Sequence, residues 1–268
     1  MLQKKLKAGL RHTMILGIIR LMEFLINNSI FVNFIVFIAK FTPFNDFFAN
    51  RYRIDNIAFI MDGNRRFGKK KSFSDLQLKK SGLNKMLEIA QYCHKLGVKD
   101  VSFFAFSLSN FSRPKNEVES LMNFIVENKD KLIMNQNTDF KPRIRVFGRL
   151  KALDKNVKEI LEKLVDETKE NRHINFNIFF AYSSKDEIET LKMNKIKQEP
   201  NSSEIYQKKV DLLIRTSGEK RLSDFMLMQS CYKTNIFFCR SLWPDFSIAQ
   251  LCLIIFKVHL ENTYLEYN

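Results

Sequence analysis

The feature that most constrains the fold is a regular alternation of short apolar runs with longer amphipathic segments between residues 54 and 262. Six apolar runs are predicted strands, at residues 56–61, 100–106, 143–148, 173–182, 210–218 and 235–238. Helices are predicted between or after them, at residues 81–98, 116–133, 153–170, 183–193, 223–230 and 247–262. Because strands joined by helical crossovers run parallel, this order predicts an α/β fold: one domain with a central, mostly parallel six-stranded sheet flanked by helices.

The first fifty residues differ from the rest. Four cations, Lys4, Lys5, Lys7 and Arg11, open the chain, and residues 24–39 carry no charge. That uncharged run falls short of the ~20 residues that a spanning helix needs. We therefore predict an N-terminal membrane-associated helical segment at residues 1–50 that lies in the membrane interface, followed by a globular domain at residues 51–268. A true span and a helix packed on the core are the alternatives, and a signal peptide is disfavoured because no small-residue cleavage site follows.

The charge balance limits the class of partner. The chain has 268 residues and a formal net charge of +15, so its natural partners are anions: nucleic acid, phosphorylated small molecules or acidic lipid headgroups. The 26 phenylalanines have core spacing and do not form exposed platforms among cations, so no nucleic-acid partner is predicted. The four cysteines form no C-x-x-C pair and the four histidines are scattered, which disfavours structural zinc and favours reduced thiols in a cytosol-facing protein.

Polar residues gather after three of the predicted strands. The first run is Met61-Asp62-Gly63-Asn64-Arg65-Arg66, the second is "FSLSNFSRP" at residues 106–114, and the third is "IRTSGEKRLS" at residues 214–223. Ligands of open parallel sheets bind beyond the carboxyl ends of the strands. Each run alone is ordinary turn or cap chemistry, but together they predict a phosphate site, because arginine forks suit phosphate oxygens and one carboxylate can hold a divalent cation. The chain has no P-loop, no G-x-G-x-x-G and no serine nucleophile elbow.

Five blocks carry a resemblance to a known family: "IAFIMDGNRRF", "FFAFSLSNFSRPKNEV", "NIFFAYSSKDEI", "DLLIRTSGEKRLSDFMLMQ" and "LWPDF". In this order and at these spacings they resemble the signature blocks of the cis-prenyltransferases, and within that family the eukaryotic dehydrodolichyl diphosphate synthase catalytic subunits. The resemblance implies a Mg²⁺-dependent transferase that elongates farnesyl diphosphate with isopentenyl diphosphate to a long-chain polyprenyl diphosphate. It further implies a place in dolichol synthesis and protein glycosylation, and a catalytic domain at residues 51–268.

The resemblance also implies roles for the residues of the first block. Asp62 is expected to be catalytic and to hold Mg²⁺ at the allylic diphosphate. Gly63, Asn64, Arg65 and Arg66 are expected to line that diphosphate, together with backbone amides at the start of a following helix. Ionising the allylic C–O bond builds negative charge on the leaving diphosphate, and a metal ion and arginines stabilise that charge.

The other blocks are expected to bind the second substrate. By resemblance, Arg215, Arg221 and Ser223 grip the isopentenyl diphosphate, while Ser107 and Asn110 lie between the two substrates. Either Asn64 or Ser107 assists in proton loss, and the sequence does not choose between them.

Two further positions and a tunnel complete the expected site. Phe111 and Arg113 shape and charge the same cleft. The growing polyprenyl chain needs a dry apolar tunnel, for which the helix around residues 81–90 and the strand at residues 100–106 are the expected walls. No motif encodes the product length.

The chain departs from the family pattern at four positions. Ser109 stands where the family usually has glutamate, and Asp75 and Lys79 stand where it often has arginine and histidine. Lys79 retains a positive charge there, whereas Asp75 does not, so substrate contacts in this stretch differ from the family's. Asn235 replaces a glutamate metal ligand of homodimeric members, which the eukaryotic catalytic subunits also lack.

Homodimeric members end in an Arg-x-Gly tail that reaches into the neighbouring site. This sequence has no arginine after Arg240 and no glycine after Gly218. The expectation is therefore a heteromer with a non-catalytic subunit of the Nogo-B-receptor type, at the cytosolic face of the endoplasmic reticulum membrane. The alternatives are a non-catalytic binding subunit that has kept the fold, disfavoured because the motif acid and arginines are present, and a basic nucleic-acid-binding protein.

Overall fold

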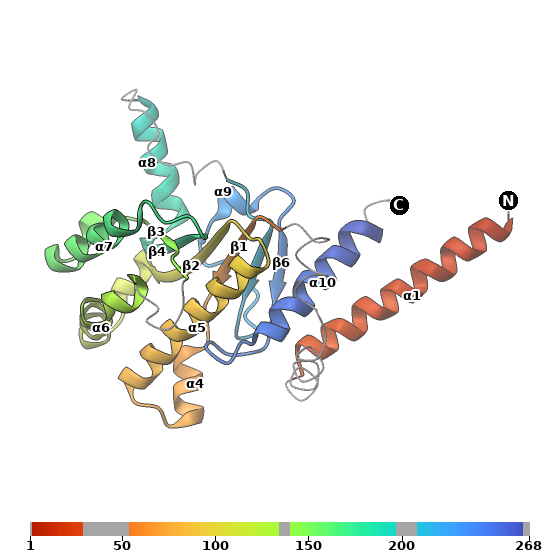
Figure 1. The fold of residues 1–268 in the computed structure, drawn as a ribbon, viewed down its shortest axis with the longest axis horizontal. Helices are drawn as coiled ribbons and strands as arrows, with labels where there is room; N and C mark the ends of the chain where they lie inside the picture. Colours follow the sequence, from red (N-terminus) through yellow and green to blue (C-terminus); the bar gives the residue numbers. More distant parts are fainter. Residues whose placement is uncertain (1, 29–53, 134–139, 197–207, 265–268) are drawn as a thin grey trace.

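The computed structural model describes residues 2–28, 54–133, 140–196 and 208–264, and for some residues at the ends of these ranges it describes the backbone only. Its centre is a six-stranded sheet in the order β3-β4-β2-β1-β5-β6 (Figure 1). Every neighbouring pair of strands is parallel. The predicted α/β class and the single domain with a parallel six-stranded sheet are confirmed.

The strands are short and their register places distant residues side by side. Their bounds are β1 Asn56–Ile60, β2 Asp100–Ser107, β3 Arg143–Phe147, β4 Asn175–Tyr182, β5 Leu212–Arg215 and β6 Asn235–Phe238. In the pairing of β1 with β5, Ile60 lies opposite Arg215. The polar runs that follow these two central strands therefore begin at neighbouring points of one sheet edge.

Helices cover both faces of the sheet. Their bounds are α1 Leu2–Ile26, α4 Asn64–Lys71, α5 Asp75–Lys95, α6 Lys115–Ile133, α7 Lys155–Thr168, α8 Ser184–Ile196, α9 Leu227–Ser230 and α10 Ile248–Tyr264, with short 3-10 helices η1 Leu108–Ser112 and η2 Leu150–Ala152. Ile57 and Phe59 belong to the larger core, with residues of α5, α6, α7 and α10. Ala58 and Ile60 point to the smaller core, which Phe225 and its neighbours close. This alternation is what a central strand buried on both faces requires.

Several predicted boundaries are corrected by the structure. The helix predicted from residue 81 begins at Asp75, because Ser74 and Gln77 form a capping box. The helix α4 was not predicted as a separate element, since only Phe67 and Gly68 of its eight residues are buried. The strand predicted to reach residue 218 ends at Arg215, and the helix predicted from residue 223 begins at Leu227. Both shortenings make room for an irregular loop beside the site.

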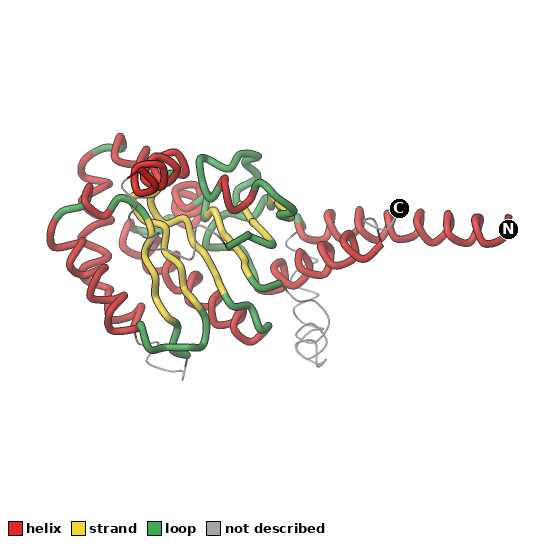
Figure 2. The backbone as a smooth tube through the Cα atoms, turned by 90° about the horizontal axis from the view of Figure 1, so that it is seen from above, coloured by secondary structure: helices red, strands yellow, loops and turns green. Residues whose placement is uncertain are grey.

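The N-terminal helix projects beyond the body of the molecule and packs along α10 (Figure 2). Ile19, Met22 and Ile26 are its buried side chains among those described. The apolar run predicted as an interfacial helix, residues 24–39, lies outside the described residues after residue 28. Among the helices that the structure describes, none combines the length and apolar character needed to cross a bilayer.

Candidate active site

Asp62 lies just beyond the carboxyl end of β1 and contacts Arg215 at the end of β5. Arg215 Nη2 donates a hydrogen bond of 2.7 Å to Asp62 Oδ2, and the Gly63 N–H donates one of 2.7 Å to Asp62 Oδ1. The Arg66 guanidinium lies 4.0 Å from Asp62 Oδ1. The structure thus brings together the predicted metal-binding acid and two of the predicted arginines.

The charge state of Asp62 follows from these contacts. Burial alone would raise the pKa of its carboxyl, but the hydrogen bond and positive charge of Arg215 and the Gly63 N–H outweigh that effect. The pKa therefore lies below its ordinary value, so the carboxylate is ionised at neutral pH. An ionised carboxylate is the kind of ligand that a hard divalent cation prefers.

The backbone around Asp62 is held from two sides. Thr216 Oγ1 accepts a hydrogen bond from Asp62 N at 2.8 Å and donates one to Asp62 O at 2.6 Å. The backbone N–H of Trp243 donates a hydrogen bond of 2.9 Å to the same carbonyl. Gly63 has φ of 105°, and a Cβ there would lie 3.0 Å from Leu242 Cα. Only glycine fits this turn, because its conformation and its close neighbour both exclude a side chain.

The loop after β5 presents the predicted second-substrate residues. Arg215 Nη1 donates to the Arg221 carbonyl at 2.6 Å and to Ser223 Oγ at 2.8 Å. Glu219 joins two of the predicted cations, with Arg221 at 2.5 Å and Arg66 at 3.7 Å. Arg66, Arg215, Arg221 and Ser223 therefore belong to one network with Asp62. The positive φ angles of Ser217, Ser223, Asp224 and Met226 mark the same loop as strained backbone, a feature that gathers at functional sites.

The "FSLSNFSRP" run forms the 3-10 helix η1 at the end of β2. Asn110 Oδ1 accepts a hydrogen bond from Ser107 N at 3.2 Å, and Ser107 Oγ pairs with Ser109 Oγ at 2.8 Å. The Phe111 ring packs edge-on against Phe106, with centroids 4.9 Å apart. These contacts are local, because the hydrogen bonds just described join Ser107 only to Ser109 and Asn110 of the same turn.

Glu117 of α6 links the second run to the first. It accepts a hydrogen bond of 3.0 Å from Arg113 Nη1 and lies 4.0 Å from Arg65 Nη1. The sequence prediction missed Glu117. The available signal was the position of Glu117, an acid in the first turn of a predicted helix directly after Arg113 and Pro114.

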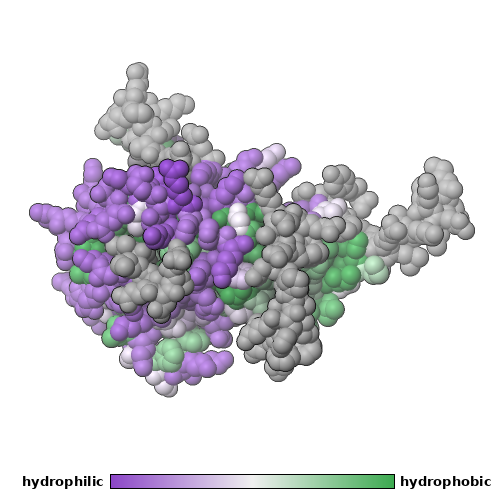
Figure 3. All heavy atoms as spheres, in the orientation of Figure 1, coloured by the Kyte–Doolittle hydropathy of each residue, from purple (hydrophilic) through white to green (hydrophobic). Residues whose placement is uncertain are grey.

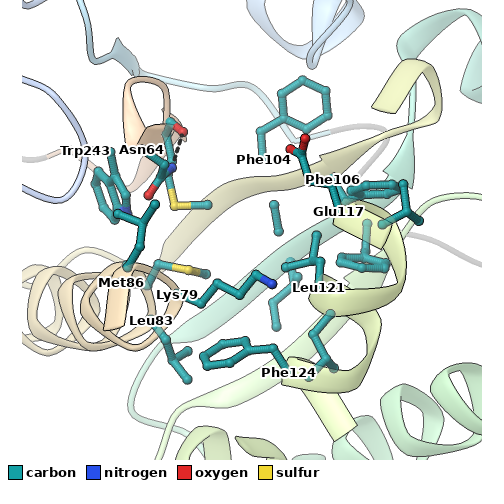
Figure 4. Close-up of a pocket in the computed structure, with 18 of the residues that line it drawn as sticks. Asn64, Lys79, Leu83, Met86, Phe104, Phe106, Glu117, Leu121, Phe124 and Trp243 are labelled. Atoms are coloured by element: carbon teal, nitrogen blue, oxygen red, sulfur yellow. Dashed lines mark hydrogen bonds between the residues drawn. The ribbon is translucent and has the colours of Figure 1, made fainter. Parts of the chain in front are cut away.

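A cavity of about 240 Å³ opens between α5 and α6 over the sheet (Figure 4). Its polar end is lined by Asn64, Arg65, Arg113 and Glu117. Its remaining wall is mainly apolar, with the following residues: Leu78, Leu83, Met86, Phe104, Phe106, Val118, Leu121, Phe124, Ile125, Leu161, Ile178, Phe180 and Trp243. The helix around residues 81–90 and the strand at residues 100–106 line this cavity, as predicted for the tunnel walls.

Lys79 is a charged side chain among the residues that line this cavity. Figure 4 shows its amine pointing into the cavity between Met86 and Leu121. Lys79 Nζ lies 2.6 Å from Asp75 Oδ2 and 2.5 Å from Ser120 Oγ. Two of the four departures from the family pattern, Asp75 and Lys79, thus pair with each other. Asn235, another of the four, lies at the amino end of β6, at the opposite edge of the sheet from Asp62. Its backbone N–H donates a hydrogen bond of 3.0 Å to the Asp211 carbonyl.

The residues present fit a magnesium ion shared with a diphosphate. Within the described residues no group of three or more His, Cys, Asp or Glu side chains could enclose a metal by itself. Magnesium is commonly held by one or two carboxylates together with substrate phosphates and water, so Asp62 alone is a sufficient protein ligand. Arg215 Nε is buried without a hydrogen-bond partner among the described residues, which leaves a donor beside that carboxylate for an anionic oxygen.

Residues 60–263 match the family model of the undecaprenyl diphosphate synthases, Prenyltransf. A dehydrodolichyl diphosphate synthase of Encephalitozoon cuniculi is 41% identical over 210 residues, which cover 78% of this chain and 72% of that protein. The chain belongs to the cis-prenyltransferase family. The predicted resemblance is confirmed, and the enzyme shares its family with the synthases of long polyprenyl diphosphates.

Two further relatives carry information on assembly and fold. A dehydrodolichyl diphosphate synthase complex subunit of Schizosaccharomyces pombe is 36% identical over 225 residues, covering 77% of this chain and 85% of that one. The structure of lavandulyl diphosphate synthase from Lavandula x intermedia, in complex with dimethylallyl diphosphate, superimposes with a TM-score of 0.68. The two sequences are 22% identical, and the superposition covers 77% of this chain and 95% of the lavandulyl diphosphate synthase chain, so it establishes the fold.

Proposed function

We propose that the chain elongates farnesyl diphosphate with isopentenyl diphosphate units, yielding a long-chain polyprenyl diphosphate of the dehydrodolichyl type for dolichol synthesis and protein glycosylation. The observation that carries the proposal is the Asp62–Arg215 pair at the sheet edge, next to an apolar cavity whose mouth holds Asn64 and Arg65. Diphosphates need cations and a metal ligand, whereas prenyl chains need a dry apolar wall. Asp62 and Arg215 provide the first, and the cavity, lined by Asn64 and Arg65 close behind Asp62 in the chain, provides the second.

The allylic diphosphate is assigned to the first polar run. Asp62 is the proposed ligand of Mg²⁺, with Gly63, Asn64, Arg65 and Arg66 around the diphosphate. Bound there, Mg²⁺ would offset negative charge on the diphosphate oxygens. The arginines stabilise the charge that builds up as the allylic C–O bond breaks, and Arg66 lies 4.0 Å from Asp62.

Isopentenyl diphosphate is assigned to the loop after β5. Arg221 and Ser223 are proposed to bind its diphosphate, and Arg215 orders that loop through its bonds to both residues. Ser107, Asn110, Phe111 and Arg113 close the cleft on the β2 side. The proton lost in each addition leaves toward Asn64 or Ser107.

The test is elongation of farnesyl diphosphate with labelled isopentenyl diphosphate and Mg²⁺, by the wild-type chain and by Asp62→Ala. The variant is expected to keep its fold, checked by circular dichroism, and to lose elongation. Asp211→Ala is the matched control, because Asp211 accepts backbone hydrogen bonds at the opposite end of the sheet. A folded Asp62→Ala enzyme that keeps most of its activity would contradict the metal-site assignment, and absence of any wild-type elongation would favour the non-catalytic alternative.

We further infer that the working enzyme is a heteromer. The related Schizosaccharomyces pombe protein is named as a complex subunit. The chain has large exposed apolar side chains at Leu227 and Met228 of α9, at Tyr232 in the turn that follows, and at Ile236 of β6, an edge strand of the described sheet. Exposed apolar side chains at and near an edge strand are suited to contact with a second subunit. The proposed partner is of the Nogo-B-receptor type and contributes the Arg-x-Gly tail.

The partner proposal is tested by comparing elongation by the purified chain with elongation after co-expression with such a subunit. Weak activity alone and strong, processive activity in the complex are expected. Ile236→Lys should reduce complex formation in gel filtration, whereas Met193→Lys, at an exposed apolar position on α8, should not. Full processive activity of the isolated chain would overturn this inference.

We propose that residues 1–50 attach the enzyme to the cytosolic face of the endoplasmic reticulum membrane, with the catalytic domain at residues 51–268. Met14, Ile18, Leu21 and Phe24 are exposed apolar side chains on α1. Figure 3 shows hydrophobic side chains gathered over α1 and α10 while the sheet domain is mostly hydrophilic. The basic N-terminal sequence complements acidic headgroups.

Membrane attachment is tested by sedimentation with vesicles of phosphatidylcholine containing phosphatidylserine. Binding that Leu21→Glu weakens and that added phosphatidylserine strengthens would support the proposal. Vesicle binding unaffected by both changes would refute it.

A further inference from the structure

The loop formed by residues 239–243 contacts both members of the catalytic pair. The Cys239 N–H donates to the Arg215 carbonyl at 2.9 Å, and the Trp243 N–H donates to the Asp62 carbonyl at 2.9 Å. Between them, Ser241 O accepts a hydrogen bond of 2.7 Å from Ser217 N, and Leu242 packs against Gly63. The position of the 239–243 loop therefore sets the backbone positions of Asp62 and Arg215.

The same loop is linked by hydrogen bonds to the end of α1, more than two hundred residues earlier in the chain. The linked residues are Ile26, the last of α1, and Asn27 directly after it. Gln250 Nε2 donates to the Ile26 carbonyl at 2.7 Å and also to Ser241 Oγ. The Arg240 N–H donates to Asn27 Oδ1 at 2.9 Å. Two independent hydrogen-bond routes thus join the end of α1 to the loop above the site.

Gln250 is placed so that a displacement of the end of α1 would also displace the 239–243 loop. Its side chain is 3% exposed, and its Oε1 accepts a hydrogen bond of 3.0 Å from Ser247 N. The amide thus bonds α1, the 239–243 loop and the start of α10 at once. A buried amide with all three partners in place has one arrangement that satisfies them together.

The rest of the α1 contact lies along α10, away from the loop. Ile19, Met22 and Ile26 are buried, and Lys257 Nζ lies 3.3 Å from Glu23 Oε1. This ion pair fastens α1 to α10 without touching the 239–243 loop. Glu23 therefore offers a control that loosens α1 while leaving both hydrogen-bond routes intact.

We propose that Gln250 and Asn27 are positioning residues, through which the docked end of α1 fixes the 239–243 loop and hence the Asp62–Arg215 pair. The kinetic part of this inference rests on the proposed function, while the structural part does not. Because α1 also carries the proposed membrane-facing side chains, a change in how α1 is docked would change the positions of Asp62 and Arg215.

Trp243 provides a readout that is independent of activity. It is the one tryptophan in the sequence, it is 1% exposed, and it lines the cavity. Its fluorescence and its quenching by acrylamide therefore report the packing of the 239–243 loop in the full-length protein.

The experiment compares Asn27→Ala, Gln250→Met, Asn27→Asp and Glu23→Gln. Asn27→Ala and Gln250→Met are expected to increase acrylamide quenching of Trp243, and to lower kcat for elongation about tenfold or more with a smaller change in KM. Asn27→Asp keeps the acceptor for Arg240 N–H and should restore both values. Glu23→Gln should leave both near wild type.

Unchanged quenching in Asn27→Ala and Gln250→Met would overturn the inference. So would an equal increase in Glu23→Gln, because general loosening of α1 would then be the cause. If the quenching pattern appears as expected but the wild-type chain, tested with its partner, elongates no prenyl diphosphate, the proposed function fails and the structural inference stands.

Discussion

Arg215 and Asp62 are 153 positions apart in the sequence, yet a hydrogen bond of 2.7 Å joins Nη2 of the arginine to Oδ2 of the acid. Arg215 is almost fully buried and Asp62 is half-buried. The pair owes its geometry to the register of β1 with β5, which sets Ile60 opposite Arg215. The acid proposed to bind metal and an arginine of the loop proposed to bind diphosphate are thereby held as one unit.

Replacing Arg215 with methionine should remove most of the pH dependence that this pair contributes to stability. In the wild type the pKa of Asp62 is lowered on folding, so the pair stabilises the protein above the ordinary pKa of aspartate, and this contribution is lost as pH falls through the lowered value. In Arg215→Met the hydrogen bond and the positive charge of Arg215 are lost, and only the Gly63 N–H and Ser217 still oppose burial, so the pKa of Asp62 rises. The stability difference from wild type, measured by urea unfolding, should be largest at neutral pH and shrink in acid. Arg172→Met, at an exposed arginine, is the control, and a difference constant with pH would refute the assignment.

Replacing Asp75 with asparagine should strengthen binding of the allylic diphosphate. Lys79 points into the cavity but its charge is compensated by Asp75 at 2.6 Å. Because Asp75 is largely exposed, we expect KM for farnesyl diphosphate to fall only about threefold, in line with ~0.6 kcal/mol for such pairs. Glu119→Gln on α6 removes an exposed acid that pairs with Lys115 at 3.6 Å and should leave KM unchanged. An increase in KM for Asp75→Asn would show that Asp75 itself assists binding.

Replacing Gly63 with alanine should damage stability and catalysis together. The φ of 105° and the approach of a Cβ to 2.9 Å from Leu242 Cδ2 both oppose a side chain. Gly97→Ala is the matched control, since Gly97 has φ of 78° but a Cβ added there would meet no atom within 4 Å. We expect Gly97→Ala to cost about 1 kcal/mol from backbone strain alone, with activity kept. Gly63→Ala should cost more and lower elongation, and equal behaviour of the two in thermal unfolding and activity would contradict the steric account.

Removing the Tyr182 hydroxyl should weaken the support of the loop after β5. Tyr182 donates a hydrogen bond to buried Glu187, which also bonds Gln229 at 2.6 Å. Burial raises the pKa of Glu187, while the bonds from Tyr182 and Gln229 oppose that rise. We expect Tyr182→Phe to cost about 1–3 kcal/mol, because a buried acceptor loses its partner.

The cost of Tyr182→Phe should also depend on pH. The raised pKa of Glu187 favours the folded state in acid, and this contribution is lost as pH rises through the folded value. Tyr182→Phe raises that value further, so its destabilisation should be larger at pH 8 than at pH 5, given an ordinary glutamate pKa of about 4.3. Tyr232→Phe, at an exposed tyrosine, should have little effect at either pH. Equal losses at both pH values would exclude a role for Glu187 ionisation.

Local patterns in the sequence were sufficient to predict the six strands and most of the helices. Apolar runs such as residues 56–61 and amphipathic segments such as residues 81–98 carry their period within ten to twenty residues. The capping box of Ser74 and Gln77 precedes the periodic segment, so the period alone places the start of α5 six residues too late. The polar residues at the strand ends were also identified, because a parallel sheet gathers those ends at one edge.

Only the tertiary structure decided which of these residues touch. The sequence contains Asp62 and Arg215, Asp75 and Lys79, and Gln250 and Ile26, but no local period relates the first pair or the last. The register of β1 with β5 brings Asp62 and Arg215 together. Lys79 points into the cavity because it lies on the face of α5 that is turned toward α6. The docking of α1 on α10 creates the contact between Gln250 and Ile26. Short-range patterns determine the elements, whereas burial of apolar surface between distant segments determines the site.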